Sequence, residues 1–295
     1  MTTNQPPPSR SPRRLSTKST DETTAGVLEN NRRPSYRSRV HPQYLDLSGA
    51  KLVGADLRRM TLINVELMGS DLSKAILSFA NLTGSNLSHA NLTGANLMGA
   101  NLFRANLLRA YLLCANLSFG MLAESRLVGA NLTDANLTYA TLDNVDLSLA
   151  ILSRAHITNA SLQFSNLSRA LLFGTKLDDA DLSGANLTGA NFRGANLTNA
   201  NLTNADLTGA NLDDADLTGA NLTGADLTNA DLTGANLTNA DLTNADLTGA
   251  NLTNADLTGA DLTGANLPEQ DIQPAKLTRA DLRTVTTIAD AVVEE

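Results

Sequence analysis

The chain contains no tryptophan, one cysteine, and aromatic residues at only 3% of its 295 positions. The single cysteine, Cys114, excludes an intramolecular disulfide and is compatible with a reducing compartment, so we expect a cytoplasmic location. No run of about eighteen apolar residues occurs, which argues against a membrane-spanning helix. The basic N-terminal residues lack the apolar stretch of a secretory signal peptide, and none is expected.

The residues of a catalytic centre are also missing. Catalysis needs a few dissimilar groups brought together, whereas this chain repeats the same few groups many times. The three histidines, His41, His89 and His156, have no Cys, Asp or Glu partner at metal-ligand spacing. No phosphate-binding loop, nucleophile elbow or dinucleotide fingerprint is present. The sequence therefore predicts no catalytic residue, no cofactor and no metal site, and a protein that is not an enzyme.

A strict five-residue period dominates what is present. From Leu47 to Leu282 every fifth residue is large and apolar, 48 positions of which 45 are Leu and the others Ile157, Phe192 and Ile272. A five-residue step advances about 140° around an α-helix, which would spread the leucines over every face. In a flat strand they would alternate between the two faces, because five is odd. All leucines point inward only if the backbone turns a corner once per repeat.

The other positions of the unit agree with such a corner. Two residues before each Leu stands Ala in most units, then Asn or Asp, and after the Leu a Ser or Thr followed by Gly or Asn. Units such as Ala195–Asn199 and Ala225–Asn229 resemble the A(D/N)LXX motif of the pentapeptide-repeat family, common in cyanobacteria and other bacteria. The resemblance implies an all-β fold, a right-handed quadrilateral β-helix with four pentapeptides per coil and about twelve coils.

Charge divides the chain into three parts. Residues 1–43 carry 8 basic and 3 acidic groups, residues 44–180 carry 10 of each, and residues 181–295 carry 4 basic and 17 acidic groups. We interpret residues 1–43 as a disordered tail rich in Ser, Thr, Pro and Arg, and 44–282 as the solenoid. Within the solenoid, 44–180 is irregular, 181–267 is nearly perfect and 268–282 is disturbed. Residues 283–295 are expected to form a C-terminal cap, in part helical.

The irregular part carries apolar residues at outward positions. With twenty residues per coil, Tyr111, Ile151 and Leu171 share one column, and Leu113 and Phe173 lie beside it. Such a strip is typical of an interaction site, and Arg residues among apolar ones are enriched at interfaces. The same spacing leaves open that irregular coils bury some of these side chains locally. The candidate partner-binding residues are Tyr111, Leu113, Ile151, Leu171, Phe173, Arg109 and Arg169.

The acidic part suggests a second function. Residues 181–282 hold 14 acidic and 3 basic groups, which over roughly 25 Å of rod is one net charge per about 2.3 Å, against about 1.7 Å for B-DNA. Some pentapeptide-repeat proteins mimic DNA and bind DNA gyrase, so the resemblance implies DNA mimicry as the alternative to a protein-binding scaffold. The candidate acidic ladder consists of two columns, Asp206, Asp226 and Asp246, and Asp241, Asp261 and Asp281.

The tail and the ends carry the remaining hypotheses. Arg13-Arg14-Leu15-Ser16 and Arg32-Arg33-Pro34-Ser35 resemble sites for a basic-directed kinase, which makes Ser16 and Ser35 candidate phosphorylation sites. The basic tail is also the one segment suited to nucleic acid, or to the acidic end of the rod. A terminal coil is a candidate contact for a homodimer. The principal prediction is a non-enzymatic scaffold that binds an unidentified protein partner.

Overall fold

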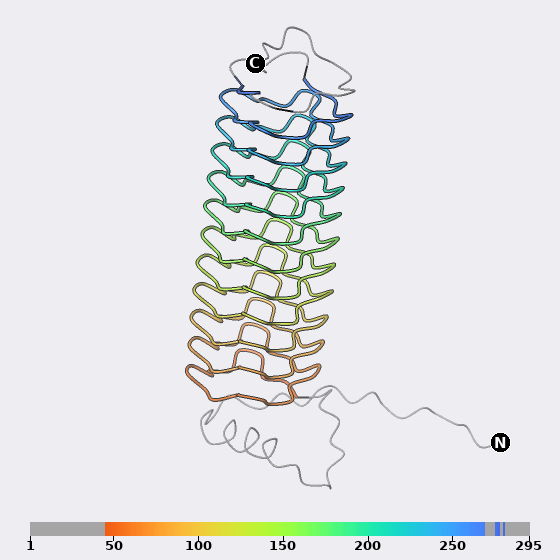
Figure 1. The fold of residues 1–295 in the computed structure, drawn as a ribbon. Coiled ribbons are helices and arrows are strands. Elements are labelled where there is room, and N and C mark those ends of the chain that lie inside the picture. Colours follow the sequence, from red (N-terminus) through yellow and green to blue (C-terminus); the bar gives the residue numbers. More distant parts are fainter. Residues whose placement is uncertain (1–44, 269–274, 278–279, 281–295) are drawn as a thin grey trace, which may run out of the picture.

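A computed structural model describes residues 45–268, 275–277 and 280. The chain winds around one axis as a stack of similar coils, and the colours in Figure 1 progress from one end of the rod to the other. Among the described residues there is no helix and no strand longer than one bridged residue. Each pentapeptide contributes one bridge position and one two-residue turn, which is the corner that the five-residue period predicted.

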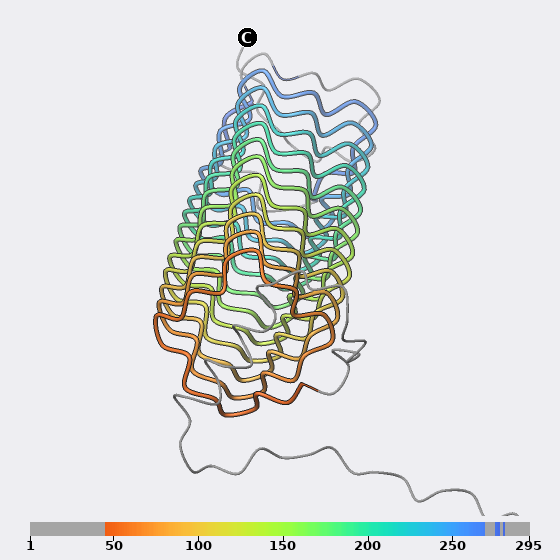
Figure 2. The same ribbon diagram turned by 90° about the horizontal axis from the view of Figure 1, so that it is seen from below.

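The register between coils is uniform. Parallel bridges join residues twenty apart, beginning with Asp46 to Glu66 and continuing to Asp256 with Lys276. Four pentapeptides therefore complete one turn, and equivalent positions stack in columns, as seen from the end of the rod in Figure 2. The right-handed sense and the number of coils remain predictions.

The backbone hydrogen bonds explain why the register holds. In a typical unit the Asn196 N–H donates to Thr175 O of the coil before it at 2.9 Å, and the Leu197 N–H donates to Asp216 O of the coil after it at 2.7 Å. The Asn199 N–H also donates to the following coil. Each coil is thus bonded to both neighbours, so a shift by one residue would misalign every unit together.

The preference for Asn or Asp before each Leu follows from the one N–H that the coils cannot satisfy. The Thr198 N–H points along the turn, and the Oδ1 of Asn196 accepts its hydrogen bond at 3.0 Å. The carboxylate of Asp246 does the same for Thr248 at 2.9 Å. Asn and Asp are therefore equivalent for the fold, and their choice sets the charge of the rod independently of its shape.

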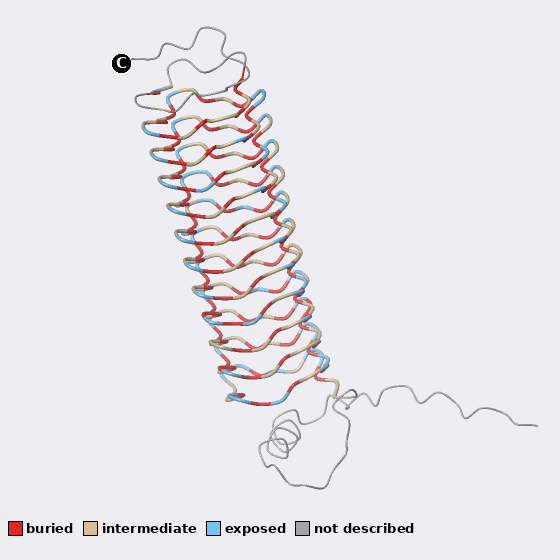
Figure 3. Cartoon of the chain, turned by 45° about the vertical axis from the view of Figure 1, so that its right-hand side comes forward, coloured by how far each residue is buried: buried red, intermediate tan, exposed pale blue. Residues whose placement is uncertain are grey.

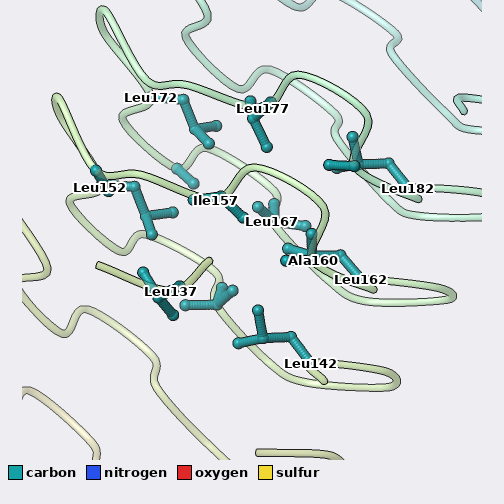
Figure 4. Close-up of a cluster of buried hydrophobic side chains, with 14 of the residues drawn as sticks. Leu137, Leu142, Leu152, Ile157, Ala160, Leu162, Leu167, Leu172, Leu177 and Leu182 are labelled. Atoms are coloured by element: carbon teal, nitrogen blue, oxygen red, sulfur yellow. The ribbon is translucent and has the colours of Figure 1, made fainter. Parts of the chain in front are cut away.

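The core consists of the period-five leucines and of the alanines two residues before them, nearly all without exposed surface. Figure 3 shows the buried backbone positions recurring in every coil. Figure 4 shows how Leu152, Ile157 and Leu162 of one coil lie below Leu172, Leu177 and Leu182 of the next. Phe192, at a leucine position, is also fully buried. Burial of this apolar stack is the main force that holds the coils together.

The turns place the second residue after each Leu in the left-handed backbone region. In residues 181–268 all of these corner residues are Gly, Asn or Asp, which tolerate that conformation. In residues 45–180, fourteen corner residues belong to other types and have φ between 52° and 60°. The irregular half therefore retains strained corners that the regular half avoids.

Serine stands at four buried positions where alanine is usual, Ser70, Ser85, Ser125 and Ser165, and two of them, Ser125 and Ser165, differ in one respect. The hydroxyl of Ser125 is buried without a hydrogen-bond partner, whereas that of Ser165 donates to Leu162 O at 2.6 Å. We expect Ser125→Ala to raise the free energy of unfolding by about 1 kcal/mol, because it removes an unsatisfied buried hydroxyl. Denaturant unfolding measures the change. Ser165→Ala is the matched control, and a gain of equal size there would contradict the explanation.

Several predictions lie outside the described residues. They concern the tail 1–43 with Ser16 and Ser35, the cap at 283–295, and most of the disturbed segment 268–282. The contact of a terminal coil with a second copy also stays a prediction.

Candidate protein-interaction surface

The predicted strip falls on one side of the rod. Bridges connect Tyr111 to Asn131, Asn131 to Ile151, and Ile151 to Leu171, so the three apolar residues share one column. Asn131 interrupts that column, which makes the strip discontinuous. Tyr111 and Leu171 are exposed, and Ile151 is half-buried.

The remaining candidates lie beside this column. Leu113, two residues after Tyr111, is half-buried. Phe173, two residues after Leu171, is 51% exposed. Arg109 and Arg169 are exposed at the corners that precede it. Leu149 stands at an equivalent corner and is 57% exposed. We define the lateral patch as Leu149, Ile151, Leu171 and Phe173, which belong to two adjacent coils.

Exposed apolar side chains are confined to the irregular half of the described chain. Every large apolar side chain with a high exposed fraction precedes residue 174, and residues 181–268 contain none. These residues are Val53, Met68, Phe79, Tyr111, Phe119, Met121, Tyr139, Leu149, Phe164, Leu171 and Phe173. Where such side chains lie next to one another, they are typical of an interaction site.

A second apolar group lies along one corner and was not selected as a site from the sequence. Phe119 and Tyr139, twenty residues apart, stack with ring centroids 5.2 Å apart at an interplanar angle of 12°. Phe79, earlier in the same column, lies over Gly99, where an added Cβ would meet the ring at 2.6 Å. We call Phe79, Phe119 and Tyr139 the aromatic corner. The signal in the sequence that could have found it is the spacing of these aromatic residues by multiples of twenty.

Nine aspartates of the regular half stand at bridge positions, and they are spread over all four columns. Between residues 181 and 268 there are 11 Asp and 1 Arg. Asp206, Asp226 and Asp246 follow one another in a single column, and Asp241 and Asp261 do so in another. Asp281, the last residue of the predicted ladder, lies outside the described residues.

Local hydrogen bonds keep several of these carboxylates ionised. The hydroxyl and the N–H of Thr248 both donate to Asp246 and hold the pKa of its carboxyl below the ordinary value. Burial alone would raise the pKa of Asp206, but hydrogen bonds from Thr208 and Thr188 outweigh it, and that pKa is also lowered. The carboxylates of Asp206 and Asp246 therefore stay charged at neutral pH, with threonines as hydrogen-bond donors.

We expect the regular half to lose stability in acid. A lowered pKa in the folded state stabilises the fold above the ordinary pKa of Asp, about 3.9, and this contribution disappears as the pH falls through the folded value. The thermal midpoint should therefore drop between pH 5 and pH 2. In Asp206→Asn/Asp246→Asn the drop should be smaller, because Asn keeps the acceptor and does not titrate. An equal drop in both proteins would contradict this assignment.

The corner at Leu149 offers a direct measure of backbone strain. We expect Leu149→Asn to raise the free energy of unfolding by roughly 1 kcal/mol, since Asn tolerates the φ of 60° better than a residue with an aliphatic Cβ does. Denaturant unfolding of Leu149→Ala provides the control, because it removes the same apolar surface but keeps the strain. Equal stability of the two variants would show that the corner is not strained.

The described residues contain no helix long and apolar enough to span a bilayer. In the same part of the chain no three His, Cys, Asp or Glu side chains gather in a way that could hold a metal ion. The thiol of Cys114 is exposed at a corner.

The chain belongs to the pentapeptide-repeat family. The family model, which describes eight copies of the pentapeptide repeat, matches this chain several times. Together the matches cover residues 45–78, 80–148 and 150–286, and those within the last two ranges overlap one another. A search of curated protein sequences gave no match.

Several solved structures are similar to this chain. HetL, a pentapeptide-repeat protein involved in the regulation of heterocyst differentiation in the cyanobacterium Nostoc sp. strain PCC 7120, is 35% identical over 74% of this chain and 91% of its own, with a TM-score of 0.51. A pentapeptide-repeat protein from the thylakoid lumen of Arabidopsis thaliana is 42% identical over 33% of this chain and 70% of its own, with a TM-score of 0.28. QnrB1, a plasmid-mediated fluoroquinolone resistance protein, is 18% identical over 64% and 84%, with a TM-score of 0.36.

Proposed function

We propose that this protein is a non-enzymatic scaffold that binds a protein partner through its irregular half, with the lateral patch at the centre of the contact. The observation that carries the proposal is the distribution of strained and exposed apolar residues. Both are concentrated before residue 180 and absent from residues 181–268. A cytoplasmic location is part of the proposal.

The strain is informative because the fold does not require it. The same corner is built from Gly, Asn or Asp throughout the regular half, at lower conformational cost. A bulky residue such as Leu149 or Phe119 at a left-handed corner lowers stability and leaves its apolar surface in water. Strained positions persist mainly where they serve a function, so the irregular corners point to a function on this half.

The likeness to HetL supports a regulatory role. HetL is described as involved in the regulation of heterocyst differentiation. We propose a regulatory role for this chain as well, one in which the rod presents a surface to another protein.

The test uses substitutions that copy the regular repeats. Ile151→Asn and Leu171→Asn reproduce Asn191 of the same column, and Phe173→Thr reproduces the Thr found at that position in later coils. The new Asn side chains can also accept the turn N–H that Ile and Leu leave without an acceptor. This triple variant should fold at least as stably as the parent.

Partners captured from the native host are identified by mass spectrometry and their affinity for both proteins is measured. The triple variant should bind at least about 30-fold more weakly, as expected when central apolar contacts are lost. Phe119→Asn/Tyr139→Asn on the aromatic corner is the control. Full retention of the partner by the triple variant would refute the proposal for the lateral patch.

DNA mimicry by the acidic half is the second candidate. It is favoured by the equivalence of Asn and Asp at the bridge positions, since the nine Asp that stand there in residues 181–268 are then not a structural requirement. Against it, the aspartates occupy four columns and do not form the two ridges of a duplex backbone. Purified protein at micromolar concentration should inhibit supercoiling by DNA gyrase if this candidate is correct. Unchanged supercoiling would exclude it.

A further inference from the structure

The lateral patch spans one side of the rod over two adjacent coils. Ile151 and Leu171 form a bridge pair in adjacent coils, so their side chains are neighbours on the same face. Phe173 follows Leu171 by two residues, and the backbone O of Phe173 accepts the N–H of Arg154 at 2.9 Å. The patch therefore extends from the bridge column to the next corner of the rod.

Four basic side chains surround this patch, and two of them are neutralised within the rod. Arg154 forms an ion pair with Asp134 at 2.6 Å. Arg193, one coil above Phe173, forms an ion pair with Asp213 at 3.0 Å. Both carboxylates belong to the coil next to their partner, so these pairs need no second protein.

The other two basic residues have no such partner. Arg169 stands at the corner before Leu171, and Lys176 stands on the next side of the coil, three residues after Phe173. Both are exposed, and neither forms an ion pair with any of the described residues. The patch is thus flanked by two positive charges that form no ion pair with the described residues, in a chain whose net charge is −8.

We infer that the lateral patch binds an acidic and apolar segment of a partner protein, in which carboxylates reach Arg169 and Lys176 while apolar side chains cover Leu171 and Phe173. The inference rests on the proposed function and adds the chemistry of the partner. Charge complementarity selects it: like charges facing each other across an interface are strongly unfavourable, so a basic segment is rejected at this face. A basic segment would meet the acidic half of the rod instead.

The test identifies the preferred ligand chemistry without knowing the partner. A library of random 12-residue peptides displayed on phage is selected on the full chain, and binders that also bind Leu171→Asn/Phe173→Thr are removed. The remaining peptides should carry a net negative charge together with apolar residues, and raised salt should weaken their binding.

Charge reversal then separates this inference from the proposed function. In Arg169→Glu/Lys176→Glu the affinity of the selected peptides should fall about tenfold or more. Arg59→Glu/Arg126→Glu changes the net charge equally on other parts of the rod, at arginines that form no ion pair with described residues. It should have little effect.

The inference is wrong, while the proposed function stands, if the peptides need Leu171 and Phe173 but are neutral or basic. The same holds if the peptides lose no more affinity for Arg169→Glu/Lys176→Glu than for Arg59→Glu/Arg126→Glu. If no selected peptide depends on Leu171 and Phe173, the proposed function of the patch fails as well.

Discussion

A Leu152→Asp variant should unfold at a much lower denaturant concentration than the parent, with a loss of several kcal/mol. Leu152 is fully buried between the equivalent leucines of the neighbouring coils, and the backbone N–H groups around it already have acceptors. A carboxylate there would have neither water nor a donor. Because each coil contacts only its two neighbours, the damage should also divide the rod into two stacks that unfold separately.

Ser153→Asp is the matched control for this prediction. It introduces the same charge one residue later, at a position where Asp213 stands three coils further along the same column. Since the side chain at position 153 points outward, the control should unfold at a denaturant concentration close to that of the parent. Equal unfolding midpoints for Leu152→Asp and the parent would mean that the leucine positions do not face a packed core.

Phe192→Ala should lower the free energy of unfolding by about 3 to 5 kcal/mol. Phe192 is the one aromatic side chain in the described core and has no exposed surface. Truncation removes its buried area and leaves a cavity that the stacked coils above and below cannot close without breaking their register. Denaturant unfolding with fitted midpoints gives the magnitude.

Phe192→Leu tests whether the cost comes from the cavity. Leu occupies almost every equivalent position, so this substitution should change the free energy of unfolding by less than about 1.5 kcal/mol. A loss as large as that of Phe192→Ala would show that the aromatic ring itself is required at this coil.

The inward leucines and the corner in every unit were predictable from the sequence because only a turning backbone reconciles a period of five with one buried face. Four units per coil came from the family resemblance, and the bridge from Asp46 to Glu66 establishes that register. A signal for it was nevertheless present. Corner residues such as Asn199 and Phe164 lie over Gly219 and Gly184, the corner glycines twenty residues later.

The candidate surface was predictable only in part. The column of Tyr111, Ile151 and Leu171 follows from the register alone. The direction of a corner side chain does not, because it depends on the left-handed turn, and Leu149 was therefore not selected. The ion pairs that neutralise Arg154 and Arg193 depend on side-chain geometry between coils. For this reason spacing alone did not reveal that Arg169 and Lys176 form no ion pair with the described residues.

The central claim is that the outward apolar residues of the irregular half serve a partner and not the fold. The affinity of the captured partner for Ile151→Asn/Leu171→Asn/Phe173→Thr, measured on protein whose unfolding midpoint is at least that of the parent, tests it most directly. We predict a loss of at least about 30-fold. Unchanged affinity in a fully folded variant would contradict the claim.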